Sequence, residues 1–259
     1  MLNIVVGYEP REWEAYNVCV DSLVRTSSQK LNIVRLDERE LRAKGLYDRP
    51  YHVTPAGQYI DDRDGRPFST GFSFTRFLVP FLGLPKGPVL FVDCDFLFID
   101  DVAGLFSLFD YGRAVQVVKH AHKPPPGMKM DGVAQVAYPR KNWSSCVLWN
   151  TAHPQHEILT VHDVNNRVGR DLQNFCWLND EHIGALPERW NWLAGISPTT
   201  GTPDRTVSAC HYTEGGPWFE DKQGCFMADE WNAARDAMLD RKPVVVVERR
   251  GPGRPKKAA

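Results

Sequence analysis

The sequence predicts an α/β fold with a mostly parallel central sheet flanked by helices. The chain opens with an apolar run at residues 2–6, a helical pattern to about residue 27, and a second apolar run at residues 31–36. This strand–helix–strand order is typical of parallel sheets with right-handed crossovers. A third apolar run, at residues 88–92, reads as a fully buried strand. With 259 residues, the chain can bury one sizeable core, so one domain over residues 1–240 is expected.

The elements follow from local patterns, taken in chain order. Apolar residues recur at helical spacing in residues 13–24 and again in residues 72–82. Residues 45–71, rich in Gly, Pro, Asp and Tyr, indicate a long surface excursion. Further strands are expected at residues 114–118 and 145–149, and a helix at residues 170–178.

Two segments are expected to be irregular. Residues 120–145 contain a long loop, which we expect to fold over a site, because loops of this length in a compact domain are usually functional or disordered. The tail, residues 241–259, ends in Gly, Pro, Lys and Arg and is expected to be disordered. Its residues 251–257 partly resemble an AT-hook, but a solvated basic tail is the favoured interpretation.

Composition excludes several classes of function. The net charge is −1, so no overall field attracts nucleic acid or an anionic membrane. No basic leader precedes the first strand and no apolar window is long enough to span a membrane. No C-x-x-C pair occurs among the six cysteines, so reduced thiols in a cytoplasmic protein are expected. The cysteines are Cys19, Cys94, Cys146, Cys176, Cys210 and Cys225.

The chemistry is concentrated where the third apolar run ends, at Asp93 and Asp95. Side chains at i and i+2 of an extended segment point the same way, so both carboxylates can reach one spot beyond the strand. Ligands bind at that edge of open α/β sheets. Oxygen ligands suit Mg²⁺ or Mn²⁺ and a phosphorylated substrate. The competing interpretation is a chance Asp-x-Asp in a solvated turn, which the preceding buried strand disfavours. Asp100 and Asp101 indicate a turn and a helix start.

Several motifs together resemble the GT-A glycosyltransferases, and most closely glycosyltransferase family 8. That family combines an Asp-x-Asp with a distant His-aromatic-x-Gly…Pro-Trp motif, and residues 211–218 read His-Tyr-Thr-Glu-Gly-Gly-Pro-Trp. The resemblance implies the GT-A fold and makes His211 a third metal ligand. An imidazole beside carboxylates favours Mn²⁺ over Mg²⁺. Residues 139–145 also resemble a segment of small bacterial and phage glycosyltransferases.

The resemblance also implies which residues hold the donor. Arg76, in the segment 74–80, corresponds to a family arginine that contacts the diphosphate or sugar; an ion pair with a sheet carboxylate is the alternative. Tyr8 corresponds to the base-binding loop, or else caps the first helix. Serine replaces the family's asparagine in segment 143–148, which puts that contact in doubt. The complete donor-binding set is Val6, Gly7, Tyr8, Arg76, Asp93, Cys94, Ser144, Ser145, Gly215 and Gly216.

The family's Asp-Gln pair near the anomeric carbon would fall at Asp180 and Glu181, ahead of a matching Leu-Pro-x-x-Trp-Asn at residues 186–191. A lysine frequent before the final Pro-Trp is missing, because Gly216 stands there; Lys222 or loop amides are the substitutes considered. Either carboxylate of the pair is a candidate nucleophile, or else orients the donor or is structural.

The expected function is sugar transfer from a nucleotide-diphosphate sugar, a UDP-sugar by resemblance, to a hydroxyl of a glycan, lipid or small molecule, with retention. Three alternative functions remain open. A haloacid-dehalogenase-type phosphatase also places Asp-x-Asp after a buried strand, but near its N-terminus and followed by Gly-Thr. An inactive binding protein on the same fold is the non-enzymatic alternative, and a nucleotidyltransferase is another enzyme.

Overall fold

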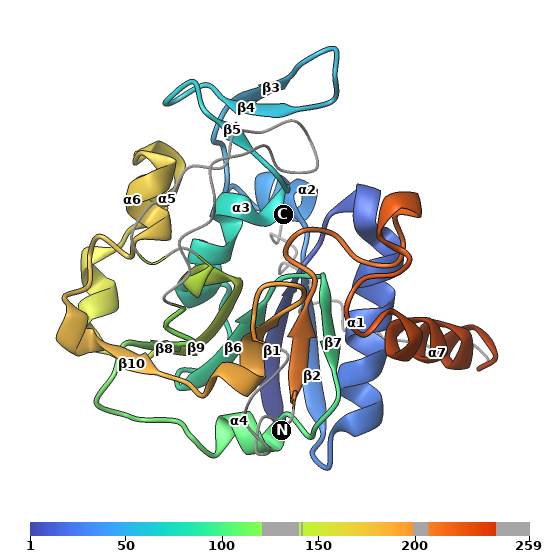
Figure 1. Ribbon diagram of the computed structural model, residues 1–259. Coiled ribbons are helices and arrows are strands. Elements are labelled where there is room, and N and C mark those ends of the chain that lie inside the picture. The colour runs from blue at the N-terminus through green and yellow to red at the C-terminus, as the bar shows by residue number, and fades with distance from the viewer. Residues whose placement is uncertain (121–139, 141, 199–206, 242–259) are drawn as a thin grey trace, which may run out of the picture.

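The computed structural model describes residues 1–120, 140, 142–198 and 207–241, and its main feature is a central sheet (Figure 1). Within these residues the sheet has six strands in the order β10-β8-β9-β6-β1-β2. Strand β9 runs antiparallel to both neighbours and every other neighbouring pair is parallel. The predicted mostly parallel α/β sheet is therefore confirmed. Its strands are β1 (Leu2–Gly7), β2 (Leu31–Leu36), β6 (Pro88–Val92), β8 (Val115–Val117), β9 (Cys146–Asn150) and β10 (Ile183–Ala185).

Both faces of the sheet are apolar, because alternate strand residues point to opposite sides. Val5, Val89 and Phe91 belong to one buried cluster. Ile4, Val6 and Leu90 belong to another. The first face is covered by α3 (Phe72–Thr75), the 3-10 helix η2 (Arg76–Phe81), α5 (Val161–Asn166) and α6 (Gly169–Gln173). The second is covered by α1 (Trp13–Thr26) and α4 (Ala103–Phe106). The strand-to-helix spacing of the sequence thus produces the layered core of Figure 1.

A second, three-stranded sheet lies beside the first, in the order β11-β12-β7. Its strands are β11 (Trp192–Leu193), β12 (Ala209–His211) and β7 (Phe96–Phe98). The apolar run after Asp95 is therefore a strand of its own. Helix α7 (Ala228–Leu239) packs against α1 through a third buried cluster that includes Trp231.

The predicted surface excursion is in fact a small antiparallel sheet of β3 (Tyr51–Val53), β4 (Tyr59–Asp61) and β5 (Pro67–Phe68), preceded by α2 (Glu38–Ala43). A buried ion pair between Arg49 and Asp61 anchors it, with Arg49 Nη1 also donating to the carbonyl of Val164 at 3.1 Å. Asp101 accepts a hydrogen bond from the amide of Ala103, which confirms the predicted helix start.

The remaining short elements are 3-10 helices. They are η1 (Pro10–Glu12), η3 (Trp143–Ser145), η4 (Pro154–Ile158), η5 (Asp180–His182), η6 (Glu188–Asn191) and η7 (Glu220–Lys222). The predicted helix at residues 170–178 is shorter than expected, since α6 ends at Gln173. Most of the predicted covering loop and nearly all of the basic tail lie outside the described residues.

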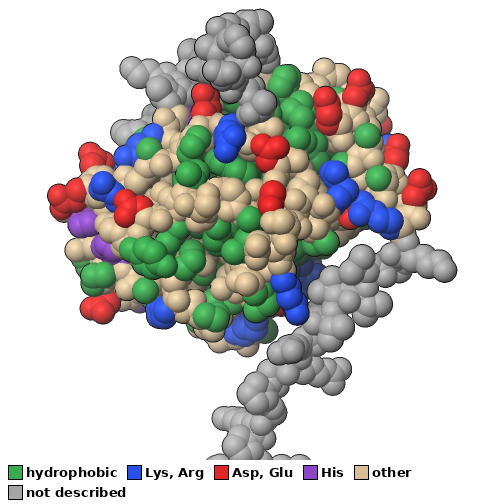
Figure 2. Space-filling view, turned by 90° about the horizontal axis from the view of Figure 1, so that it is seen from below, with side chains coloured by type: hydrophobic (Ala, Val, Ile, Leu, Met, Phe, Trp, Pro, Cys, Tyr) green, Lys and Arg blue, Asp and Glu red, His purple; other side chains and the backbone are tan. Residues whose placement is uncertain are grey.

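The surface carries both signs of charge. On the face shown in Figure 2, acidic and basic side chains are interspersed among apolar and uncharged areas. All six cysteines are free, four of them buried. Among the described residues, every helix is too short or too polar to cross a bilayer.

Candidate metal centre and donor site

Two strand pairings assemble the predicted ligands at the carboxyl end of β6. Asp93 directly follows this strand, and its amide donates to the carbonyl of Ser145 at 2.9 Å. Strand β7 then pairs antiparallel with β12 so that His211 lies opposite Phe96. The amide of Tyr212 donates to the carbonyl of Asp95 at 2.9 Å. Sheet register therefore brings the distant histidine beside the Asp-x-Asp.

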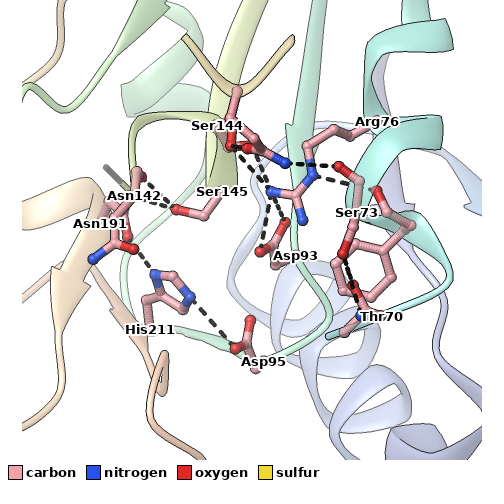
Figure 3. Close-up of polar contacts among 12 residues, drawn as sticks. Thr70, Ser73, Arg76, Asp93, Asp95, Asn142, Ser144, Ser145, Asn191 and His211 are labelled. Atoms are coloured by element: carbon pink, nitrogen blue, oxygen red, sulfur yellow. Dashed lines mark hydrogen bonds and ion pairs between the residues drawn. The ribbon is translucent and has the colours of Figure 1, made fainter. Parts of the chain in front are cut away.

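Asp93, Asp95 and His211 form a three-ligand cluster (Figure 3). Each offers one ligand atom, and these atoms all lie within 4.8 Å of one another. His211 Nε2 is 3.4 Å from Asp95 Oδ2. Asp95 Oδ1 is buried and has no hydrogen-bond partner within the described part of the chain. A buried carboxylate oxygen without a partner is costly, so this set fits a divalent cation. Its mixture of hard oxygens and one imidazole suits Mn²⁺.

The electrostatics of the two carboxylates differ. Burial raises the pKa of Asp93 to about 7, against the opposing effect of the Arg76 guanidinium, and the nearby Asp95 raises it further. Burial also acts to raise the pKa of Asp95, but attraction and hydrogen bonding by His211 bring it below its ordinary value. A cation between the two carboxylates would remove this conflict, because it favours the charged form of both.

Arg76 is buried and anchors Asp93 in place. Its Nη1 lies 2.9 Å from Asp93 Oδ1 and donates to the carbonyl of Ser144 at 3.0 Å. Its Nε donates to the carbonyl of Phe72 at 3.3 Å. The predicted alternative, an ion pair with a carboxylate of the sheet, is thus present, and that carboxylate belongs to the ligand cluster itself.

One polar residue that the sequence did not single out, Gln173, reaches the same place. Its Oε1 accepts from the hydroxyl of Ser144, and its Nε2 donates to the carbonyl of Ser73 at 2.8 Å. Gln173 closes α6 beside the core residues Leu172 and Phe175. That position on a short helix was its only sequence signal.

The end of β1 approaches α3 closely. A Cβ added to Gly7 would lie 2.6 Å from the ring of Phe72, so only glycine allows this contact. Val6 is fully buried, and Tyr8 packs edge-on against Tyr16 with ring centroids 5.1 Å apart. The strand end predicted to hold the base is therefore fixed against the segment that carries Arg76.

The loop after His211 requires both of its glycines. Gly215 has a φ of 92°, which favours glycine. A Cβ on Gly216 would lie 2.1 Å from the ring of Trp218. The loop therefore keeps its backbone close to the indole at the place where the resemblance expects the diphosphate.

Three other predicted residues occupy different environments. The side chain of Cys94 is buried in the core, so only its backbone can face a donor. Asp180 and Glu181 do not join the cluster. They precede Ile183, which pairs with Val115 at the amino end of β8.

That end of β8 is level with the amino end of β6, because Asn150 pairs with Pro88 and its amide donates to the carbonyl of Ala114. Glu181, 74% exposed, lies toward this end, where its carbonyl accepts from Arg113. Asp180, 87% exposed, pairs with Arg140, which also donates to the carbonyl of Asn174 next to Gln173. The structure does not bring Asp180 or Glu181 into the Asp93, Asp95 and His211 cluster, and their expected position near the anomeric carbon stays a prediction.

Comparison of the whole chain with known proteins finds one informative relative by sequence. Protein CDI of Arabidopsis thaliana is 43% identical over 229 residues, which cover 88% of this chain and 83% of the plant protein. The chain belongs to the Protein CDI family. No family model matches it. The predicted resemblance was to small bacterial and phage proteins, whereas this relative is from a plant; membership of glycosyltransferase family 8 stays a prediction.

Solved structures similar to this CDI-family chain are glycosyltransferases. The galactosyltransferase LgtC, in complex with donor and acceptor sugar analogs, has a TM-score of 0.54 at 12% identity, over 93% of this chain and 98% of its own. Mouse xyloside xylosyltransferase 1 has a TM-score of 0.53 at 13% identity, over 83% of this chain and 99% of its own. The bifunctional glycosyltransferase WbbM has a TM-score of 0.57 at 14% identity. The match covers 90% of this chain but only 49% of WbbM, so the chain spans about half the length of that protein. The CDI-family chain therefore has the GT-A glycosyltransferase fold.

Proposed function

We propose that this CDI-family protein is a metal-dependent glycosyltransferase. It would move a sugar from a nucleotide-diphosphate sugar, a UDP-sugar by resemblance, to a hydroxyl of a glycan, lipid or small molecule. The observation that carries the proposal is the Asp93, Asp95 and His211 cluster at the carboxyl end of β6. In a GT-A fold this edge of the sheet is where a nucleotide ligand binds.

The residues of the cluster would hold Mn²⁺, or Mg²⁺, through Asp95, His211 and one oxygen of Asp93. A bound cation supplies Lewis-acid stabilisation of the charge that develops on a leaving diphosphate. Arg76 favours the ionised form of Asp93 and orients its carboxylate, since Arg76 is itself fixed by the carbonyls of Phe72 and Ser144. The close approach of Gly216 to Trp218 fixes the loop that we propose to hold the diphosphate.

Retention of configuration is proposed from the resemblance. Ser144 and Gln173, hydrogen-bonded to each other beside Arg76, are the groups we propose to face the sugar. An amide cannot act as a carboxylate nucleophile, and among the described residues Asp180 pairs with Arg140 and Glu181 with His182 rather than with the cluster. This arrangement favours front-side displacement over a covalent glycosyl intermediate.

The cellular setting is part of the same proposal. Six free cysteines, four of them buried, support a reducing compartment, and we propose the cytoplasm. Residues 1–240 would act as one catalytic domain that carries a basic tail.

The test is donor hydrolysis across a panel of nucleotide sugars with Mn²⁺, comparing wild type, Asp95→Ala and Asp101→Ala. Asp101 is a carboxylate at a helix start outside the cluster and serves as the control. We expect metal-dependent release of nucleoside diphosphate from one donor, retained in Asp101→Ala and lost in Asp95→Ala. Absence of release from every donor, together with no thermal shift by UDP and Mn²⁺, would overturn the proposal and favour a binding protein. Release of inorganic phosphate instead would favour the phosphatase alternative, which the observed fold does not support.

A further inference from the structure

Asn191 contacts the proposed metal ligand His211 from inside the protein. Its side chain is completely buried, and Oδ1 lies 2.8 Å from Nδ1 of His211 (Figure 3). On its other side, Nδ2 lies 3.0 Å from the hydroxyl of Ser145 and 3.4 Å from the carbonyl oxygen of Asn142. The amide therefore connects the histidine to the segment that precedes β9.

The neighbours of Asn191 determine which way its amide points. The hydroxyl of Ser145 donates to the carbonyl of Asn142 at 2.8 Å, so that hydroxyl offers a lone pair to Asn191. Ser145 and the Asn142 carbonyl therefore both accept, and the NH₂ group of Asn191 must face them. A flipped amide would point its oxygen at a carbonyl oxygen. The oxygen of Asn191 is thus the atom that faces His211.

This orientation fixes the protonation of the imidazole. Oδ1 of Asn191 can only accept, so Nδ1 of His211 must carry a hydrogen. In the neutral ring, Nε2 is then bare, and it faces Asp95 Oδ2 at 3.4 Å. These two atoms call for a cation between them: a proton when Nε2 is protonated, the form whose hydrogen bond lowers the pKa of Asp95, or a metal ion when Nε2 is bare. Ligand atoms about 2.1 Å from an ion and at right angles lie about 3 Å apart, which is close to this separation.

The ring has a second constraint. Phe96 stacks on the imidazole with centroids 4.5 Å apart and an angle of 13° between the rings. The stacked phenyl sets the plane of the ring, and Asn191 sets its rotation within that plane. Together they hold Nε2 toward the carboxylates before any ion binds.

We propose that Asn191 is a positioning residue that holds His211 in the tautomer with Nε2 free for the metal, and that Ser145 and the Asn142 carbonyl in turn orient Asn191. The proposal rests on the metal-dependent function proposed above. Metal-binding histidines generally donate their second ring N–H to such an acceptor, and loss of the acceptor typically weakens metal binding about 10- to 100-fold.

A purely structural role is the alternative, and the chain offers a matched control for it. Asn165 is also buried, and its amide makes four hydrogen bonds, all to backbone groups. Replacing Asn165 removes comparable bonds from the fold without touching the cluster. Asn191 differs because its oxygen is bonded to a proposed ligand.

The experiment is a titration of the full-length protein with Mn²⁺ in the presence of UDP, following free Mn²⁺ by electron paramagnetic resonance. Asn191→Leu removes the acceptor at similar size and is expected to weaken Mn²⁺ binding about 10- to 100-fold. Asn191→Asp keeps the acceptor for Nδ1 but loses the donors to Ser145 and Asn142, and is expected to bind Mn²⁺ more tightly than Asn191→Leu. Asn165→Leu is expected to lose stability and keep the wild-type affinity.

The outcomes separate the two proposals. Wild-type affinity in Asn191→Leu would overturn the role of Asn191 and leave the proposed function standing. No Mn²⁺ binding by the wild type would overturn both. Nitrogen-15 NMR of the imidazole in the metal-free wild type adds a measurement that needs no variant. We expect a proton on Nδ1 of His211, and a bare Nδ1 would overturn the inference even if Asn191→Leu fails to fold.

Discussion

The guanidinium of Arg76 and the carboxylate of Asp93 form a buried ion pair inside the proposed metal centre, with Nη1 and Oδ1 2.9 Å apart. The first carboxylate of the Asp-x-Asp is thus shared between the protein and any ion. Asp95 faces the imidazole of His211 instead of a guanidinium, which leaves it as the carboxylate more available to the metal.

Arg76→Met should destabilise the metal-free protein by about 3 kcal/mol, because it leaves the buried Asp93 carboxylate without its compensating charge. Urea unfolding measures the loss. Arg76→Met combined with Asp93→Asn removes both charges and should recover part of it. The loss in free energy of unfolding should therefore be smaller in the double variant than the sum of the losses in the two single variants. An equal or larger loss would contradict this account.

Gln173→Ala should slow donor turnover on the order of 100-fold, the effect of a displacement of about 1 Å among positioned groups. Its side chain bridges Ser144 and Ser73 beside Arg76. Asp180→Asn and Glu181→Gln should leave turnover unchanged, because Asp180 contacts Arg140 and Glu181 contacts His182 rather than the cluster. The steady-state rate of UDP release distinguishes these three variants. A large loss of rate in Glu181→Gln, with Gln173→Ala unaffected, would contradict the role proposed for Gln173.

Stability should depend on pH through His156. Burial lowers the pKa of this histidine from 6.5 to about 4, against a hydrogen bond between Nε2 and the carbonyl of Ala114. The unfolded ring binds a proton near pH 6.5 and the folded ring does not, so stability is complete above that pH and falls as the pH drops toward 4. Unfolding by urea at several pH values should show a loss of roughly 3 kcal/mol across this window. His156→Gln should remove that contribution. If the free energy of unfolding of the variant depends on pH as in the wild type, a group other than His156 causes the effect.

Gly216→Ala should destabilise the loop that follows His211 by about 1 to 3 kcal/mol, because the new methyl group overlaps the indole of Trp218. The melting temperature reports this. Trp218→Leu should tolerate the same alanine much better, since it removes the overlapping ring. Equal losses in both backgrounds would show that the clash is not the cause.

The main strands and the carboxylates of the metal centre could be predicted from the sequence for a simple reason. Long apolar runs such as residues 88–92 can only be buried, and the extended backbone places Asp93 and Asp95 on one side. Strands β3, β4 and β5 were not predicted, because two or three residues among turn signals carry no readable period.

Other parts of the site are not determined by sequence pattern. Asp180 and Glu181 were assigned by their order along the chain, and order alone does not determine how far they lie from Asp93, so their role stays a prediction. Gln173 and Asn191 act through hydrogen bonds to residues 29 and 20 positions away. Such contacts depend on three-dimensional packing, which single-sequence patterns do not encode.

The pairing of β7 with β12 has a consequence for biosynthesis. Ribosomes release the chain from its amino end, so both aspartates emerge long before His211. The imidazole can join them only once β12 has reached β7, near the end of synthesis. A nascent or prematurely terminated chain that stops before residue 211 carries the carboxylates without the histidine that completes the ligand set. Capture of the ion by the full set would therefore mark a polypeptide that has been finished and folded.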